Sequence, residues 1–321
     1  MALANIVWDN HACMPLRPND AAFLPQLKRF RDAGVDVVTL NVYFDSHPWE
    51  LALHMLAHFR AWVMGHPEDY ALPSSVADIR RAKGDNKLAI IFDIEGGCAL
   101  NGRLSMIELY YELGVRWMLI AYNSNNELGG GCQDNDQGLT KFGRQVIDEM
   151  ARIGMVTCCS HTGYKTAMEA IEYSSNPVIF SHSNARALKD HPRNIPDDTI
   201  KSCANRGGVI GINGIGIFLG DADASTAQII RHIDYISDLV GPEHVGLGID
   251  FAFDEQELND YVANNPLLFP KKMGYGQGMQ MAKPEQIPEI GDELARKGYS
   301  DAEVSGILGN NFLRVAELVW K

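Results

Sequence analysis

Histidine and carboxylate side chains follow apolar runs at several places in this sequence. Imidazole nitrogens and carboxylate oxygens are the usual protein ligands of zinc and related divalent ions. A single histidine after a strand is most often a structural, hydrogen-bonded residue, but the repetition of ligand-type groups after one run after another indicates a metal site. These groups are Asp9, His11, Glu95, His161, His182 and Asp250.

A cysteine lies close to the first of these groups. Asp9, His11 and Cys13 are spaced by two residues, so their side chains share one face for as long as a strand continues. A thiolate is a good zinc ligand, and His11 and Cys13 could bind one ion together. Cys13 could also be a small buried apolar side chain, and its spacing leaves both interpretations open.

Arg193 lies in a short loop after His182. A guanidinium group on a catalytic face can hold a substrate carboxylate in a bidentate pair. The alternative is a loop arginine that pairs with Asp190 or Asp197. Spacing alone does not distinguish a substrate-binding role from this structural one.

A fold has to bring these side chains together, and the pattern of apolar residues along the sequence predicts which fold this is. Apolar, β-rich runs alternate with helical patterns such as Leu139–Gly154, whose apolar residues repeat every 3.6 positions. Strand and helix alternation favours a parallel sheet covered by helices, and eight such units favour a closed (β/α)₈ TIM barrel of the α/β class. The candidate strands are Asn5–Trp8, Val35–Val42, Leu88–Asp93, Arg116–Ala121, Met155–Cys159, Val178–Phe180, Gly208–Asn213 and His244–Gly248.

The barrel explains why the ligand-type groups could meet, because the carboxyl ends of its strands converge on one face. The alternative is an open, doubly wound sheet, but no GxGxxG motif follows the first strand. The segments Asp45–Pro73 and Phe251–Pro284 are expected to be long connections that form a rim or lid. We expect one barrel domain over residues 1–321, with terminal helices after Gly298.

The composition and charge of the chain limit the classes of function that are possible. The chain has 321 residues, 46% of them hydrophobic and 21% charged, as expected of a globular protein with a large core. A net charge of −13 without a basic cluster gives no attraction to nucleic acid or to an anionic membrane surface. Met1–Phe23 lacks the pattern of a signal peptide, and six sparse cysteines indicate reduced thiols. We therefore expect a cytoplasmic protein.

Several stretches along almost the whole chain resemble the membrane dipeptidase (renal dipeptidase) family of zinc peptidases, which are amidohydrolase-like barrels. Each stretch alone is a weak signal, but together they are specific. The stretches are Asp9-Asn10-His11, Asp93-Ile94-Glu95-Gly96-Gly97, Gly138–Gly143, Ser160-His161, Val178–Ser183, His191–Asp198, Gly248–Phe251 and Gly309–Val315.

The resemblance implies two zinc ions at the mouth of a (β/α)₈ barrel. Glu95 would bridge the ions, His161 and His182 would complete one site, and His11 would contribute to the other. Arg193 would hold the substrate, and Asp250 would carry a proton. Family members cleave small dipeptides, often with a D-residue on the C-terminal side, and a homodimer is an expectation at the level of the family.

This chain differs from the family pattern at two positions where the family has residues of its catalytic site. The family has His-x-Asp after the first strand, where this chain has His11-Ala12-Cys13. The family also has a substrate-polarising histidine at the position of Tyr122. A tyrosine can donate a hydrogen bond to a developing oxyanion or to the substrate, but it cannot carry an imidazolium charge. Cys13 could replace the aspartate as a ligand, or the first metal site could be altered.

Three functions remain open from the sequence. The first is a metal-dependent hydrolase in which metal-bound hydroxide attacks the amide of a dipeptide or an N-acyl amino acid. The second is a one-metal hydrolase of another small amide, an ester or a lactone. The third is a non-catalytic barrel that binds a small ligand. We expect one or two zinc ions per chain; about two would favour the first function and about one would favour the second.

Overall fold

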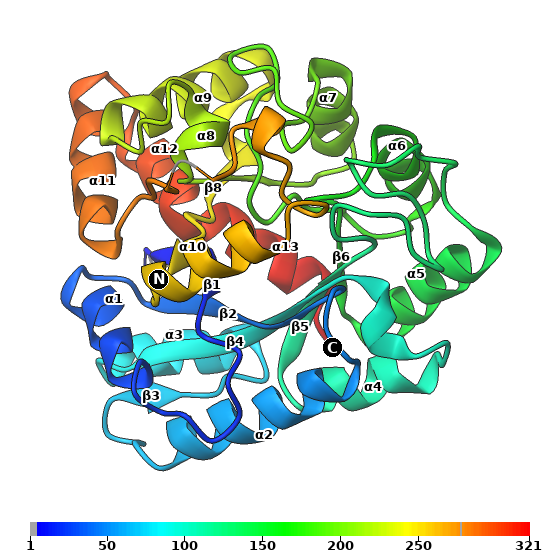
Figure 1. Cartoon of the computed structure of the whole chain (residues 1–321). Coiled ribbons are helices and arrows are strands. Elements are labelled where there is room, and N and C mark those ends of the chain that lie inside the picture. Colours follow the sequence, from blue (N-terminus) through cyan, green and yellow to red (C-terminus); the bar gives the residue numbers. More distant parts are fainter. Residues whose placement is uncertain (1–4, 277) are drawn as a thin grey trace.

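The computed structural model describes residues 5–276 and 278–321 (Figure 1). Met1–Ala4, the start of the segment predicted to lack a signal peptide, lie outside this range. No described helix has both the length and the apolar composition that a membrane crossing needs.

The strands are β1 (Trp8–Cys13), β2 (Val37–Phe44), β3 (Tyr70–Ala71), β4 (Leu88–Glu95), β5 (Val115–Leu119), β6 (Val156–Cys158), β7 (Ile210–Ile212), β8 (Val245–Leu247) and β9 (Phe251–Ala252).

The strands close into a parallel barrel. The sheet has the order β6-β5-β4-β2-β1-β8-β7. Its two ends meet through the run 178–180, where Ile179 pairs in parallel with Cys158 of β6, and Phe180 pairs in parallel with Ile210 of β7. This run completes the ring of eight strands predicted from the sequence, so the TIM barrel is confirmed and the open sheet is excluded.

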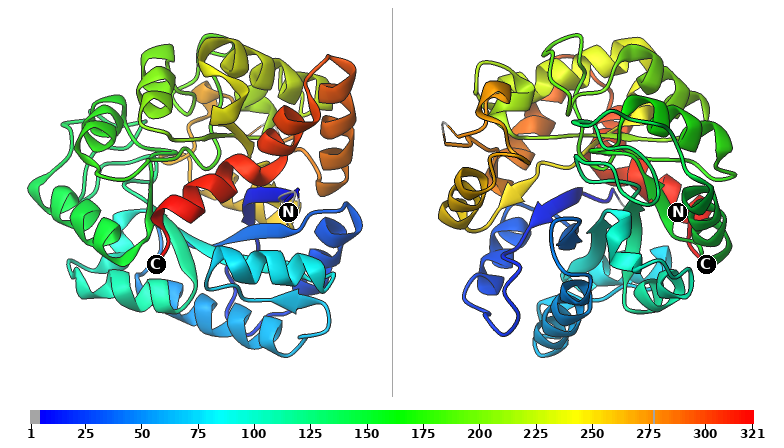
Figure 2. Two further views of the ribbon diagram at one scale, coloured as in Figure 1. Left: turned by 180° about the vertical axis from the view of Figure 1, so that it is seen from behind. Right: turned by 45° about the vertical axis from the view of Figure 1, so that its right-hand side comes forward.

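Helices surround the ring. In Figure 1 the helix α10 (Glu255–Asn264) lies in front of the barrel, and from behind, in Figure 2, α13 (Asn311–Val319) crosses it instead. The helices are α1 (Lys28–Asp32), α2 (Glu50–Met64), α3 (Val76–Gly84), α4 (Ser105–Glu112), α5 (Lys141–Ile153), α6 (Tyr164–Tyr173), α7 (Asp197–Asn205), α8 (Gly216–Leu219), α9 (Thr226–Val240), α10 (Glu255–Asn264), α11 (Ile287–Arg296), α12 (Asp301–Ser305) and α13 (Asn311–Val319).

The helix α5 shows how local sequence sets an element. The Thr140 side chain accepts a hydrogen bond from the Gly143 N–H and so caps the N-terminus. Val146, Ile147 and Met150 are buried on one face, as the 3.6-residue pattern predicts. Gly154 ends the helix in the left-handed conformation, with φ 100°.

The end of the barrel opposite the strands' carboxyl ends is apolar and sealed by α13. Trp8, Trp117 and Phe312 belong to one buried cluster there. The rings of Trp8 and Phe312 lie 6.2 Å apart, and Trp8 also meets Trp320 edge-on at 5.9 Å. This plug leaves the other end as the open one.

The predicted bounds of the first strand are wrong. It was predicted at Asn5–Trp8, but β1 runs from Trp8 to Cys13, because its polar residues are buried rather than exposed beyond the strand. The two segments predicted as long connections also contain regular elements: α2 and β3 lie within Asp45–Pro73, and β9 and α10 lie within Phe251–Pro284. The helix α10 reaches over the open end of the barrel.

Candidate metal centre

Along the strand β4, the residues that face the inside of the barrel change from apolar at the sealed end to polar at the other end. Ala89 and Ile91 belong to the apolar cluster at the sealed end. Asp93 and Glu95 follow at the same two-residue spacing, and both are buried. Because alternate residues of a strand share a face, the same inward face ends in two carboxylates.

Glu95 meets three histidines at the carboxyl ends of the strands. Its Oε1 atom lies 3.2 Å from His182 Nε2, 3.4 Å from His161 Nε2 and 3.7 Å from His11 Nε2. The Nε2 atoms of His161 and His182 are 3.0 Å apart. All four side chains are buried. The convergence predicted for these residues is therefore present.

Each histidine is oriented through its other ring nitrogen. Nδ1 of His161 lies 2.7 Å from Asn123 Oδ1, and Nδ1 of His11 lies 3.1 Å from Asp93 Oδ2. Nδ1 of His182 lies 2.7 Å from Ser181 Oγ. Amide and carboxylate oxygens only accept hydrogen bonds, so a neutral His161 or His11 carries its proton on Nδ1 and presents a lone pair at Nε2.

These donor atoms fit a divalent cation. Glu95 Oε1 is buried and has no hydrogen-bond donor among the described residues. It faces Nε2 of His161, which carries a lone pair when Nδ1 donates to Asn123, and two acceptor atoms this close repel each other unless a proton or a cation lies between them. Imidazole nitrogen with carboxylate oxygen is a donor set that suits zinc.

A second group shares His11 with the first. Cys13 Sγ lies 3.4 Å from His11 Nε2 and 3.4 Å from Asp250 Oδ1. His11 Nε2 is 3.5 Å from the same Asp250 oxygen, while Asp250 Oδ2 accepts a hydrogen bond from Asn213 Nδ2 at 2.8 Å. The three side chains His11, Cys13 and Asp250 are thus close enough to hold one ion.

Burial governs the charges of the cation-free site. It raises the pKa of Glu95 to about 8 and that of Cys13 to about 12. Burial also lowers the pKa values of His161 and His182 well below the usual range. For His11 burial acts in the same direction, but nearby Asp93, Cys13 and Glu95 together raise its pKa well above 6.5. Without a cation, ionisation of Glu95 and Cys13 and protonation of His161 and His182 are therefore unfavourable.

Two of the site residues have unusual backbone conformations. His161, after β6, and Asp250, after β8, both have φ of 61°. The left-handed region is uncommon for residues other than glycine and costs conformational energy. The fold holds both side chains in place against this cost, as occurs where the positions of side chains matter more than local stability.

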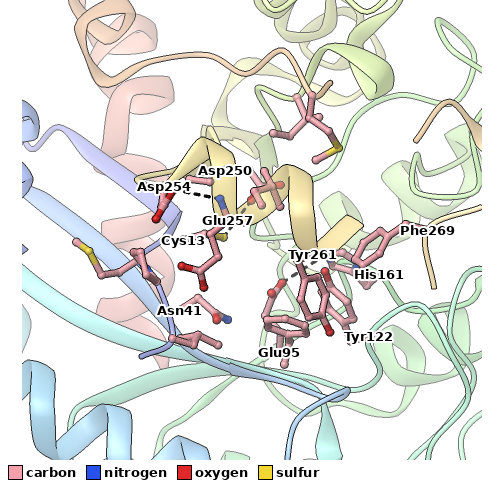
Figure 3. Close-up of a pocket in the computed structure, with 18 of the residues that line it drawn as sticks. Cys13, Asn41, Glu95, Tyr122, His161, Asp250, Asp254, Glu257, Tyr261 and Phe269 are labelled. Atoms are coloured by element: carbon pink, nitrogen blue, oxygen red, sulfur yellow. Dashed lines mark hydrogen bonds and ion pairs between the residues drawn. The ribbon is translucent and has the colours of Figure 1, made fainter. Parts of the chain in front are cut away.

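An aromatic-lined pocket opens above the site (Figure 3). Glu95, His161, Cys13 and Asp250 line it together with Tyr122. The Tyr122 ring stacks on the His161 ring with 4.1 Å between centroids. Burial raises the pKa of Tyr122 well above 10, so its hydroxyl remains a hydrogen-bond donor.

Arg193 is buried beside the site, and neither pairing considered from its spacing is present. Its Nη1 donates to Ser183 Oγ at 3.3 Å and its Nη2 to the His182 carbonyl at 2.9 Å. Nε is buried and has no partner among the described residues. Asp190 lies near Arg186, and Asp197 accepts a hydrogen bond from Tyr235. Arg193 lines a second pocket that shares His161 with the first.

Asp9 does not join the histidines. The pairing of β1 with β2 shifts register between Asp9 and Ala12, which breaks the two-residue alternation expected for Asp9, His11 and Cys13. Asp9 Oδ1 instead accepts a hydrogen bond from the Ile249 N–H at 2.8 Å. His11 lies within the shifted stretch and Cys13 after it, and their side chains still meet, with Sγ 3.4 Å from Nε2.

Sequence reasoning missed the residues that orient the histidines. Asp93 could have been found, because it precedes Glu95 by two positions on the same strand and therefore shares its face. Asn123 lies in the loop after β5, and nothing in its local sequence indicates a contact with His161, 38 residues further along the chain.

The sequence matches a family model described as membrane dipeptidase (peptidase family M19) over residues 9–271. An uncharacterized Klebsiella pneumoniae protein from the pqqA 5′ region is 30% identical over 259 residues, covering 77% of this chain and 88% of that protein. Dipeptidase aclJ of Aspergillus oryzae is 31% identical over 262 residues and 79% of this chain. The match spans only 57% of that dipeptidase's length.

Solved structures share the fold over nearly the whole chain. An amidohydrolase from Pseudomonas aeruginosa superposes with a TM-score of 0.89 at 25% identity, covering 98% of this chain and 97% of the other. A metallopeptidase from Rhodobacter sphaeroides, bound to a phosphinate mimic of the dipeptide L-Ala-D-Ala, gives a TM-score of 0.81 at 20% identity, with 98% and 99% covered.

Proposed function

This chain belongs to the membrane dipeptidase family, peptidase family M19, and on that basis we propose that it hydrolyses the amide bond of a small dipeptide at a zinc centre. It is a hydrolase of a metal-dependent family. The observation that carries the proposal is the meeting of three imidazole Nε2 atoms at one buried, unpartnered oxygen of Glu95.

The residues divide into two ion sites with shared members. His161 and His182 would hold one ion with Glu95, and His11, Cys13 and Asp250 surround the place for a second. Bound there, the ions would supply Lewis acidity that polarises the scissile carbonyl and acidifies the attacking water. The second group supports two ions rather than one, with the Cys13 thiolate in the place of a carboxylate.

The protein's own groups would handle the proton and the substrate. Asp250 is positioned to take the proton of the water as the new C–O bond forms, and to deliver it to the amide nitrogen as the C–N bond breaks. Tyr122, with its hydroxyl protonated, would donate a hydrogen bond to the carbonyl oxygen as negative charge develops there. The unpartnered Nε of Arg193 would contribute to binding the substrate's carboxylate.

The test is turnover of a dipeptide panel by protein that has been stripped of metal and reloaded with zinc. The panel includes L-Ala-L-Ala, L-Ala-D-Ala and an N-acetyl amino acid. We expect hydrolysis of at least one dipeptide, absent before reloading and restored after it. Zinc-loaded protein that hydrolyses no member of the panel would contradict the proposal.

The role of Cys13 has a spectroscopic test. Cobalt(II) replaces zinc in such sites and gives a thiolate-to-metal absorption band in the near ultraviolet when sulfur is bound. Wild-type protein loaded with cobalt should show the band, and Cys13→Ser should lack it while retaining the ion held by His161 and His182. A spectrum that is the same in both proteins would remove Cys13 from the ligand set.

A further inference from the structure

Six aromatic side chains form a continuous wall around the pocket above the metal site, and we name this set the aromatic arc. All six line the same pocket. Ring centroids of successive members lie 5.1, 5.4, 5.8, 5.3 and 6.1 Å apart. In order, the members are Tyr122, Phe44, Tyr261, Phe269, Tyr275 and Phe218.

The two ends of the arc touch groups with proposed roles in the reaction. Tyr122 stacks on His161 at one end. At the other end the guanidinium carbon of Arg193 lies 5.5 Å from the centre of the Phe218 ring. The arc therefore extends from a metal ligand to the arginine proposed to bind the substrate carboxylate. A dipeptide bound between these groups would lie along it.

The middle of the arc is fixed to two different elements. Phe44 ends β2, whereas Tyr261 lies on α10. The Tyr261 hydroxyl lies 2.5 Å from Ser46 Oγ, which ties α10 to the loop after β2. In Figure 3 the rings of Tyr261, Tyr122 and Phe269 lie together on one side of the pocket, with Cys13 and Asp250 on the other. The aromatic side is thus preformed rather than a flexible surface.

The other residues that line the pocket are polar at the metal site and largely apolar along the wall. The polar groups nearest the metal site are Glu95, His161 and Asp250, while Met14, Leu258 and Met279 extend the apolar wall. The described lining residues include neither lysine nor arginine, and the carboxylates of Asp254 and Glu257 are among them, both paired with Arg17. An acidic substrate side chain would therefore find no free cation along the wall, whereas an apolar one would be buried.

We propose that the aromatic arc makes the site selective for dipeptides with an aromatic or large aliphatic side chain on the N-terminal residue, a proposal that rests on the dipeptidase function above. Arg193 lines the second pocket, next to Phe218, and takes the C-terminal carboxylate there, so the C-terminal residue occupies that end of the arc. Phe44 and Tyr261, further along the arc, then face the side chain of the N-terminal residue. Tyr261 is the specificity-determining residue.

The experiment compares kcat/KM of the zinc-loaded enzyme for Phe-Ala, Leu-Ala, Ala-Ala and Glu-Ala. We expect Phe-Ala and Leu-Ala to exceed Ala-Ala by about 10-fold or more, since burying additional apolar groups in a pocket gives discrimination of this order. Glu-Ala should be the poorest substrate. The order should appear with either configuration of the C-terminal alanine.

Three variants locate the source of the selectivity. Tyr261→Ala should reduce the Phe-Ala to Ala-Ala ratio to about a tenth of the wild-type ratio, because the ring is lost. Tyr261→Phe keeps the ring and should keep the ratio, although it lacks the bond to Ser46. Tyr173→Ala removes an exposed tyrosine on α6 that does not line the pocket, and it should change kcat/KM for neither Phe-Ala nor Ala-Ala.

The outcomes separate this proposal from the function on which it rests. Hydrolysis of Ala-Ala and Phe-Ala with equal kcat/KM would overturn the selectivity and leave the dipeptidase function standing. A ratio that is unchanged in Tyr261→Ala would remove the arc as its cause. If no dipeptide is hydrolysed by zinc-loaded protein, both the function and the selectivity are wrong.

Discussion

The Nε2 atoms of His161 and His182 lie 3.0 Å apart, and one oxygen of Glu95 lies within 3.4 Å of both. Each ring is oriented through its Nδ1, by Asn123 in one case and by Ser181 in the other. A buried carboxylate oxygen and an imidazole lone pair at this distance repel each other unless a cation or a proton lies between them. The relationship between these two histidines therefore places the candidate metal centre at Glu95.

Removal of the group that orients His161 should weaken metal binding. Asn123→Ala leaves Nδ1 of His161 without its acceptor, and loss of such a partner typically lowers metal affinity by about 10- to 100-fold. Competition with a zinc chelator measures the affinity. Asn135→Ala, an exposed asparagine in the same loop, is the matched control. Equal affinities in the two variants would show that Asn123 does not support the centre.

The Tyr122 hydroxyl should matter for the rate rather than for the fold. Tyr122→Phe retains the ring that stacks on His161 and removes only the donor. If the hydroxyl stabilises the developing oxyanion, kcat should fall by about 100- to 1,000-fold with little change in KM. Steady-state kinetics on the best dipeptide decides this. A variant with wild-type kcat would exclude the hydroxyl from the reaction.

Asp250 should be needed for proton transfer. Asp250→Asn keeps a side chain of the same shape beside Asn213 but can no longer carry the proton. We expect kcat to fall by about 100- to 10,000-fold, while the ion held by Glu95, His161 and His182 is retained. Kinetics and elemental analysis are measured on the same sample. Activity close to that of the wild type would contradict this role.

A buried histidine remote from the site predicts a pH effect on stability. His232 is fully buried, donates from Nε2 to the Leu219 carbonyl at 2.9 Å and accepts the Ala185 N–H at Nδ1. Burial lowers its pKa to about 4. The unfolded chain then binds more protons between pH 6.5 and 4, so the stabilisation is complete above pH 6.5 and is lost as the pH falls toward 4.

The comparison is with His232→Gln, which cannot titrate. The free energy of unfolding of the wild type should fall relative to that of the variant as the pH drops from 6.5 to 4, by at most about 3 kcal/mol. Denaturant unfolding at both pH values measures the difference. If the difference between the two proteins does not change with pH, His232 is already charged or is not buried in solution.

The sequence alone predicted the barrel because its strands are apolar, short and separated by amphipathic helices. It also predicted that Glu95, His161 and His182 meet, since each follows a strand and barrel strands end on one face. It misplaced β1, because Asp9, Asn10 and His11 are polar residues buried inside a strand. The register shift that removes Asp9 from the site has no sign in the sequence.

Contacts that depend on loops could not be predicted. Asn123 reaches His161 only through the path of the chain after β5, and the pairing of Arg193 with Ser183 depends on a buried turn. The aromatic arc joins β2, α10 and the segments around them, which lie far apart in the chain. Such contacts depend on tertiary packing rather than on local pattern or periodicity.

The candidate metal centre is tested most directly by anomalous diffraction from zinc-soaked crystals, recorded on both sides of the zinc absorption edge. We expect a peak between Glu95, His161 and His182, at the roughly 2.0–2.2 Å from oxygen and nitrogen that zinc adopts. A second peak is predicted beside His11, Cys13 and Asp250. The absence of any peak at Glu95 in zinc-saturated crystals would contradict the metal centre and the hydrolysis proposed on it.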